Sequence, residues 1–120
     1  KSQKARDIMH KNIVVVKATD QIDIAIKLMK QKGLSQLPVF DKGHLVGLIS
    51  ERGIVDNLGI ENLGTKRTSV IMEDAPPAIS EDSPVKVVSE LLKYNLIVVV
   101  YKKAELVGVI TKADLLKTIG

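Results

Sequence analysis

Thr111 and Asp114 are the residues whose types and spacing suggest chemistry most directly. They lie three positions apart, where an apolar run gives way to a helical pattern. The Thr111 hydroxyl and the free backbone N–H groups of a first helical turn could hold a phosphate, whose charge Lys112 could neutralise. Asp114 lies one turn along on the same side, where its two oxygens could accept hydroxyl groups. The same spacing also fits a capping box, in which both side chains only close the helix end.

Other residue types point away from catalysis. The sequence has no cysteine, which excludes disulfides, iron–sulfur clusters and thiolate chemistry. Its two histidines, His10 and His44, fall in expected loops with no carboxylate at ligand spacing, so we interpret both as surface residues. The sequence contains no nucleophile–base pair and no Walker loop. We therefore expect no enzyme activity, no metal site and no required cofactor.

An internal repeat organises the chain. Residues 7–9 match residues 70–72 at an offset of 63, and residues 45–50 match residues 106–111 at an offset of 61. Two copies of this length suggest a pseudo-twofold pair rather than a solenoid. We place the first repeat at 1–60, with 1–6 as a lead-in, a linker at 61–69 and the second repeat at 70–120.

Each copy predicts the order β-α-β-β-α, which is an α/β fold. In the first copy we expect strands at 13–16, 36–40 and 44–49, with helices at 21–32 and from the Ser50 cap to about 58. In the second copy we expect strands at 78–79, 96–101 and 105–110, with helices at 84–93 and 112–118. Thr19 or Asp20 is expected to cap the first helix, and Gly33 to end it.

Composition narrows the class of protein. Of 120 residues, 45% are hydrophobic and 27% charged, which is typical of a folded globular domain. Aromatic residues are only 2%, too few for stacking platforms that bind single-stranded nucleic acid. The net charge of +4 favours small anionic partners without indicating DNA binding. No apolar run approaches the length of a membrane span, so we expect no membrane contact and a cytoplasmic location. Because the chain begins with Lys1, we also expect it to be a piece of a longer protein.

Two motifs in this duplicated frame resemble those of CBS domains. Residues 33–39, Gly-Leu-Ser-Gln-Leu-Pro-Val, resemble the G-h-x-x-h-P element of that family, where h is apolar. Residues 108–114, Gly-Val-Ile-Thr-Lys-Ala-Asp, resemble its G-h-x-T-x-x-D element. The resemblance covers about residues 5–119 as a tandem pair. Residues 50–55 and 72–77 look most similar to CBS pairs that follow a helix-turn-helix domain in archaeal regulators.

The resemblance implies a regulatory module that binds an adenosyl ligand (AMP, ADP, ATP or S-adenosylmethionine) between the repeats. Such a module controls an attached effector domain, for example a transcription factor. In the family, a cleft combines the first-strand and G-h-x-x-h-P region of one repeat with the G-h-x-T-x-x-D element of the other. One cleft would then be formed by Asn12, Val14, Leu34, Ser35, Pro38, Thr111, Lys112 and Asp114. Asp114 would hold the ribose.

The opposite cleft departs from the family pattern. Its residues would be Ser50, Gly53, Ala78, Ile79 and Ile97. Gly53 stands where the second repeat has Asp114, and a glycine has no side chain to bind ribose. An aspartate at position 53 would restore the acceptor. We therefore expect one competent cleft and one degenerate cleft.

The same observations leave a second function open, that of a ligand-free dimerisation module with vestigial clefts. Gly53 favours this alternative, whereas Asp114 favours ligand sensing. In both cases we expect a homodimer and no direct nucleic-acid binding by this chain, although an attached domain could bind DNA. The apolar helix faces expected to meet the second copy are Ile22, Ala25, Ile26 and Met29 in the first repeat, and Val85, Val88, Leu91 and Leu92 in the second.

Overall fold

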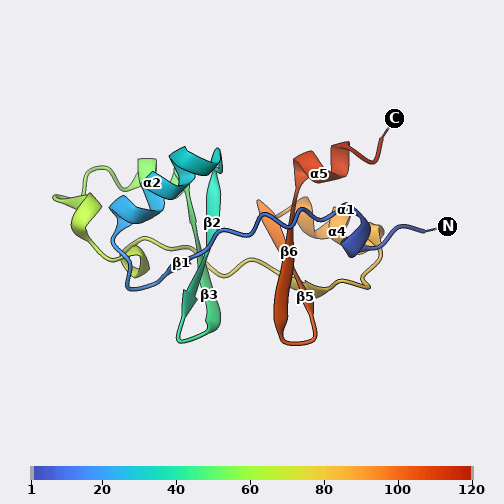
Figure 1. The fold of residues 1–120 in the computed structure, drawn as a ribbon. Helices are drawn as coiled ribbons and strands as arrows, with labels where there is room; N and C mark the ends of the chain where they lie inside the picture. Colours follow the sequence, from blue (N-terminus) through green and yellow to red (C-terminus); the bar gives the residue numbers. More distant parts are fainter. Residues whose placement is uncertain (1, 120) are drawn as a thin grey trace. The chain divides into compact units, whose positions relative to one another are not determined.

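The structure, a computed structural model, describes residues 2–119 and forms two compact units (Figure 1). The continuous unit is Val14–Ala75, and the two-segment unit consists of residues 2–13 together with residues 76–119. Lys1 and Gly120, the outer limits of the predicted repeats, lie outside the described residues. The opening of the chain thus belongs to the unit that is built mainly from the second repeat.

The continuous unit carries a three-stranded sheet with helices. Its elements are β1 (Val16–Lys17), α2 (Ile22–Lys32), β2 (Gln36–Asp41), β3 (His44–Ser50) and α3 (Glu51–Asp56). The strand order is β1-β2-β3, with β1 parallel and β3 antiparallel to β2.

Positive φ angles shape two turns of this unit. The β2–β3 turn contains Lys42 at φ 50° and Gly43 at φ 80°, as a tight hairpin with the natural strand twist requires. Gly33 ends α2 at φ 65°, which confirms the predicted helix end.

The two-segment unit repeats this topology. Its elements are α1 (Ala5–Ile8), β4 (Ala78–Ser80), α4 (Val85–Leu92), β5 (Ile97–Lys102), β6 (Glu105–Thr111) and α5 (Lys112–Leu116). The strand order is β4-β5-β6, again with one parallel and one antiparallel pairing. The predicted α/β class and the β-α-β-β-α order of each repeat are confirmed. None of the helices within residues 2–119 combines the length and the apolar character that crossing a membrane requires.

The structure corrects the start of one predicted strand and shows local structure in the predicted lead-in and linker. The first strand begins at Val16 rather than at Ile13, because the Ile13 amide donates to the Lys11 carbonyl (3.0 Å) in a local turn. The predicted lead-in at 1–6 is partly helical, and Ala5 is fully buried in the core. The predicted linker at 61–69 contains the 3-10 turn η1 (Leu63–Thr65) and the start of η2 (Thr68–Val70), and buries Leu63 and Thr68.

The start of α2 also differs from the prediction. Neither Thr19 nor Asp20 caps this helix, which begins after Gln21 without a side-chain cap. Asp20 instead accepts the Lys17 amide at 2.8 Å in the preceding turn. The free Ile22 amide donates to the carbonyl of Lys66 at 2.9 Å. The predicted linker therefore supplies the hydrogen-bond acceptor for the Ile22 amide that a capping side chain would otherwise have supplied.

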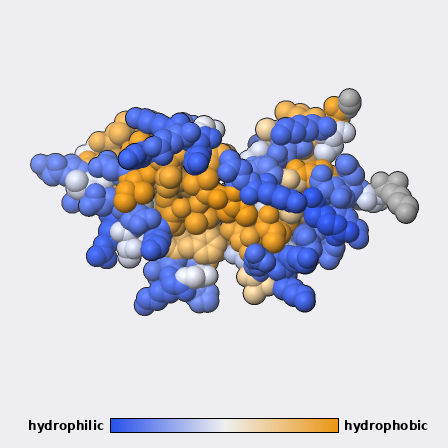
Figure 2. All heavy atoms as spheres, in the orientation of Figure 1, coloured by the Kyte–Doolittle hydropathy of each residue, from blue (hydrophilic) through white to orange (hydrophobic). Residues whose placement is uncertain are grey.

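The apolar helix faces form the core of each unit. In the continuous unit, Ile22 and Ala25 of α2 are fully buried and pack with Leu37 and Val39 of β2. In the two-segment unit, Val88 and Leu92 of α4 pack with the strands. Figure 2 shows hydrophilic residues over the outer side of α2 and hydrophobic residues gathered over the strands beneath it. Most of these helix positions therefore face the core, whereas Ile26 and Met29 also line an apolar groove. The homodimer itself stays a prediction.

A methionine packs closely on a strand glycine in each unit. Met9 covers Gly108 of β6, where an added Cβ would lie 2.3 Å from the Met9 Sδ and 2.9 Å from its Cβ. Met72 covers Gly47 of β3, where an added Cβ would lie 2.8 Å from the Met72 Sδ. The absence of a side chain at Gly108 thus lets Met9 of residues 2–13 approach the strand closely.

We predict that Gly108→Ala destabilises the protein by about 1–3 kcal/mol, the usual cost of overpacking a core. Rotation of the methionine cannot relieve the clash, because it includes the Met9 Cβ. The matched control is Gly59→Ala, since an added Cβ there meets nothing within 4 Å. Urea unfolding measures both variants. Equal stability of Gly108→Ala and Gly59→Ala would contradict this packing.

Candidate functional site

Asp114 is held at one end of the two-segment unit by three donors on a single oxygen. Its Oδ2 accepts the Thr111 amide at 2.8 Å, the Thr111 hydroxyl at 3.3 Å and a hydrogen from His10 Nδ1 at 2.9 Å. Because a carboxylate only accepts, Nδ1 is the protonated ring nitrogen of His10. The side chain is 5% exposed. The capping box left open by the sequence is therefore present.

The capping contacts leave the other oxygen of Asp114 for another partner. Within residues 2–119, the nearest cation to Oδ1 is the Lys117 ammonium at 3.8 Å, which is beyond hydrogen-bond distance. Lys117 is itself 78% exposed, so water weakens this pair. Capping and ligand binding are thus compatible roles, because each can use a different oxygen of the same carboxylate.

His10 is a site residue that the sequence analysis missed. Its amide donates to the Val109 carbonyl at 3.0 Å, and its carbonyl accepts the Val109 amide at 3.0 Å. This pairing sets the residue beside β6, with its ring against Asp114. The available signal was its position directly after Met9, which the repeat aligns with Met72. The other histidine, His44, is exposed at the start of β3.

The remaining predicted residues of the two-segment unit lie around the same strands. Thr111 closes β6 and is the register partner of Ile97, a buried residue at the start of β5. Lys112 is exposed directly after Thr111, and Asn12 is exposed near the end of the opening segment. Ala78 and Ile79 lie in β4, with Ala78 exposed and Ile79 half-buried.

The continuous unit holds the other predicted residues. Val14 and Leu34 are half-buried against its core, Ser35 is exposed and Pro38 is buried in β2. Ser35 is joined to the end of β3, since its carbonyl accepts the amide of Glu51 at 2.9 Å.

Ser50 and Gly53 form the counterpart of Thr111 and Asp114. The Ser50 hydroxyl oxygen accepts the Gly53 amide at 3.0 Å, which confirms Ser50 as a cap. The same hydroxyl donates to Glu73 Oε2 at 2.6 Å. Glu73 is a second residue that the sequence analysis missed. Each unit thus contains its own part of the predicted clefts, and a cleft with residues of both units stays a prediction.

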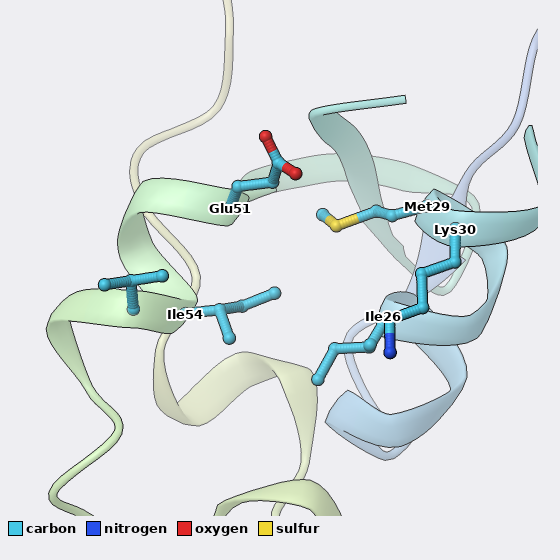
Figure 3. A pocket seen from close by; sticks show the side chains of 6 residues that line it. Ile26, Met29, Lys30, Glu51 and Ile54 are labelled. Atoms are coloured by element: carbon cyan, nitrogen blue, oxygen red, sulfur yellow. The ribbon is translucent and has the colours of Figure 1, made fainter. Parts of the chain in front are cut away.

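The continuous unit also contains an apolar groove between α2 and α3. Figure 3 shows Ile26 and Met29 of α2 facing Ile54 of α3 across it. Lys30 and Glu51 border the groove, and Val55, which also lines it, is 62% exposed. Within residues 2–119, no group of three or more histidine, aspartate or glutamate side chains could hold a metal ion.

The sequence of this chain is similar to those of several known proteins. A protein of Methanocaldococcus jannaschii, Uncharacterized protein MJ0188, is 28% identical over 123 residues, covering 98% of this chain and 44% of the relative. The inosine-5'-monophosphate dehydrogenase of the same organism is 32% identical over 119 residues, covering 96% of this chain and 23% of the enzyme. The chain thus spans less than half the length of these relatives.

Solved structures share the fold. The conserved CBS domain protein TA0289 of Thermoplasma acidophilum has a TM-score of 0.84 at 25% identity, covering 100% of this chain and 71% of that one. The CBS domain of a bacterial CNNM/CorC family Mg²⁺ transporter, solved in complex with ATP, also has a TM-score of 0.84, at 18% identity, covering 98% of this chain and 87% of that one.

The family comparison covers both repeats. The model of the CBS domain matches residues 5–59 and again residues 68–120. These two ranges include both sets of strands and the helices α3 and α5, which follow Ser50 and Thr111. The chain therefore belongs to the CBS-domain family and contains two CBS repeats.

Proposed function

We propose that this chain is a regulatory module that binds an adenosyl ligand and controls an attached effector domain. The observation that carries the proposal is the carboxylate of Asp114, which is oriented by three donors on Oδ2 and keeps Oδ1 without a close partner among residues 2–119. This carboxylate ends the stretch 108–114, which resembles the G-h-x-T-x-x-D element and lies within the second matched CBS range. One structural neighbour was solved with ATP, which supports nucleotides as the ligand class.

The proposed roles follow from the chemistry of each side chain. Asp114 accepts a ribose hydroxyl through Oδ1, because a carboxylate is a strong acceptor of O–H donors. Lys112 is exposed one residue after Thr111 and can attract a phosphate. Asn12, Val14, Leu34, Ser35 and Pro38 form the remainder of the proposed cleft. AMP, ADP, ATP and S-adenosylmethionine share the ribose that Asp114 would hold.

Control of an effector requires that the ligand bind two states of the protein unequally. A ligand shifts an equilibrium only by its differential affinity for the two states. We propose a cytoplasmic protein whose effector domain, such as a transcription factor, responds to this shift. CBS repeats also occur within enzymes, as in the inosine-5'-monophosphate dehydrogenase relative, of which this chain covers 23%.

A second candidate function is a ligand-free dimerisation module. The observation that favours it is the apolar groove between α2 and α3, where Val55 is 62% exposed. Burial of such a surface against a second copy would be favourable. The groove includes Ile26 and Met29, two of the α2 positions from which the sequence predicts a homodimer.

We predict that Asp114→Asn weakens AMP or ATP binding by about 1.5–3 kcal/mol, the range for a hydrogen bond to a charged group. The asparagine keeps an oxygen for the Thr111 amide but turns an N–H₂ group toward the ligand hydroxyls. The control is Glu90→Gln, which removes an exposed carboxylate paired with Lys93. Titration calorimetry measures both. Unchanged affinity in Asp114→Asn would contradict the proposed ribose contact.

For the dimerisation candidate, we predict that Val55→Glu converts a homodimer into a monomer, because it places a charge in the groove. The matched control is Leu58→Glu. Leu58 is 64% exposed and, unlike Val55, is not among the residues that line the groove. Light scattering at micromolar concentration reads out the mass. A monomeric parent protein, or equal dissociation by both variants, would argue against the groove as the interface.

A further inference from the structure

His10 and Glu73 occupy equivalent places in the two units. They are 63 positions apart, and each follows the methionine that covers a strand glycine. His10 exchanges two backbone hydrogen bonds with Val109, both of 3.0 Å. Glu73 exchanges two with Leu48, of 2.7 and 3.0 Å. The backbone therefore delivers each side chain to the same point, beside the end of the last strand.

The two side chains meet different partners at that point. His10 meets the carboxylate of Asp114, three residues after the capping Thr111. Glu73 meets the hydroxyl of Ser50, and three residues after Ser50 the chain has Gly53. The two-segment unit thus combines His10, from the segment before its sheet, with Asp114 in α5. The continuous unit combines Glu73, from the corresponding segment of the second repeat, with Gly53 in α3.

The side chain nearest to Gly53 is that of Glu73. An added Cβ at position 53 would lie 2.9 Å from Glu73 Oε2 and 3.3 Å from the Ser50 hydroxyl. The φ of Gly53 lies outside the left-handed region, so the backbone itself does not demand glycine. The carboxylate of Glu73 therefore occupies the place toward which an aspartate side chain at position 53 would point. Our expectation that Gly53→Asp would simply restore an acceptor overlooked this carboxylate.

The bonding of the two carboxylates is also alike. In each unit a capping hydroxyl donates to one carboxylate oxygen: Thr111 to Asp114 Oδ2 and Ser50 to Glu73 Oε2. The second oxygen, Glu73 Oε1, accepts no hydrogen bond from any residue in the described range 2–119. Glu73 is exposed, so this oxygen is open to an incoming donor.

We propose that Glu73 is the ligand-binding carboxylate of the continuous unit and accepts the ribose hydroxyls that Asp114 accepts in the two-segment unit. This inference rests on the proposed function, because it assumes an adenosyl ligand. It replaces the expectation of one degenerate cleft: the acid that is missing at Gly53 is supplied by the opening segment of the second repeat.

The test is titration calorimetry of AMP, ATP and S-adenosylmethionine with the parent chain, Glu73→Gln and Asp114→Asn. Glu73→Gln keeps an oxygen for Ser50 but replaces the free acceptor with a donor. We expect two sites per chain, one of which weakens about 10-fold or more in Glu73→Gln. The other site weakens in Asp114→Asn. Glu61→Gln is the control, since it removes an exposed carboxylate elsewhere in the continuous unit.

The outcomes separate the inference from the proposed function. If none of the three ligands binds the parent chain, the proposed function fails. If binding depends on Asp114 and is unchanged in Glu73→Gln, the proposed function stands and the role of Glu73 is overturned. If Glu73→Gln removes binding, alone or beside a second site that depends on Asp114, the inference is supported.

An exchange of residues tests the pairing without any ligand. Gly53→Asp should lower the melting temperature, since its side chain meets the carboxylate of Glu73. The double variant Gly53→Asp/Glu73→His reproduces the His10–Asp114 pair and should recover most of the loss. A melting temperature that rises in Gly53→Asp alone, or that the second substitution does not recover, would overturn the pairing.

Discussion

The close contact between a methionine and a strand glycine determines how each unit is completed. Met9 and Met72 lie so near to Gly108 and Gly47 that no larger residue fits either strand position without displacement. The contact acts together with paired backbone hydrogen bonds, His10 with Val109 and Glu73 with Leu48, to hold each methionine segment against the last strand. Because tightly packed core atoms have little room to move, each methionine fixes the position of the residue that follows it, His10 or Glu73.

The acids near the last strand depend on this anchor in different ways. Asp114 is 5% exposed and would be costly to bury without partners, yet the anchored His10 and the capping Thr111 give Oδ2 three donors. Glu73 is itself carried by an anchored segment and reaches Ser50 from the exposed side. One unit thus holds its acid by burial and many bonds, whereas the other holds its acid by the backbone that delivers it.

The order of elements could be predicted from sequence because each signal was local. Apolar runs, the Gly33 helix end and the Ser50 cap are each encoded within a few neighbouring residues. The contacts that were missed join residues far apart in the chain. The Ile22 amide donates to the Lys66 carbonyl, and the His10 ring donates to Asp114, which is 104 positions away in the sequence. A histidine that is isolated in sequence carries no mark of such a partner, so its interpretation as a surface residue was the natural one.

The same reasoning applies to Gly53. Comparison of the repeats position by position shows an acid lost at 53, but the chemistry of this corner depends on two positions that come from different segments. A single exchange at either position is unfavourable: an acid at 53 would face Glu73, and an acid at 10 would face Asp114. Positions 10 and 114, like 73 and 53, are therefore coupled, and their effects will not be additive. In a duplicated fold, the meaningful unit of comparison is the pair of residues that meet in space.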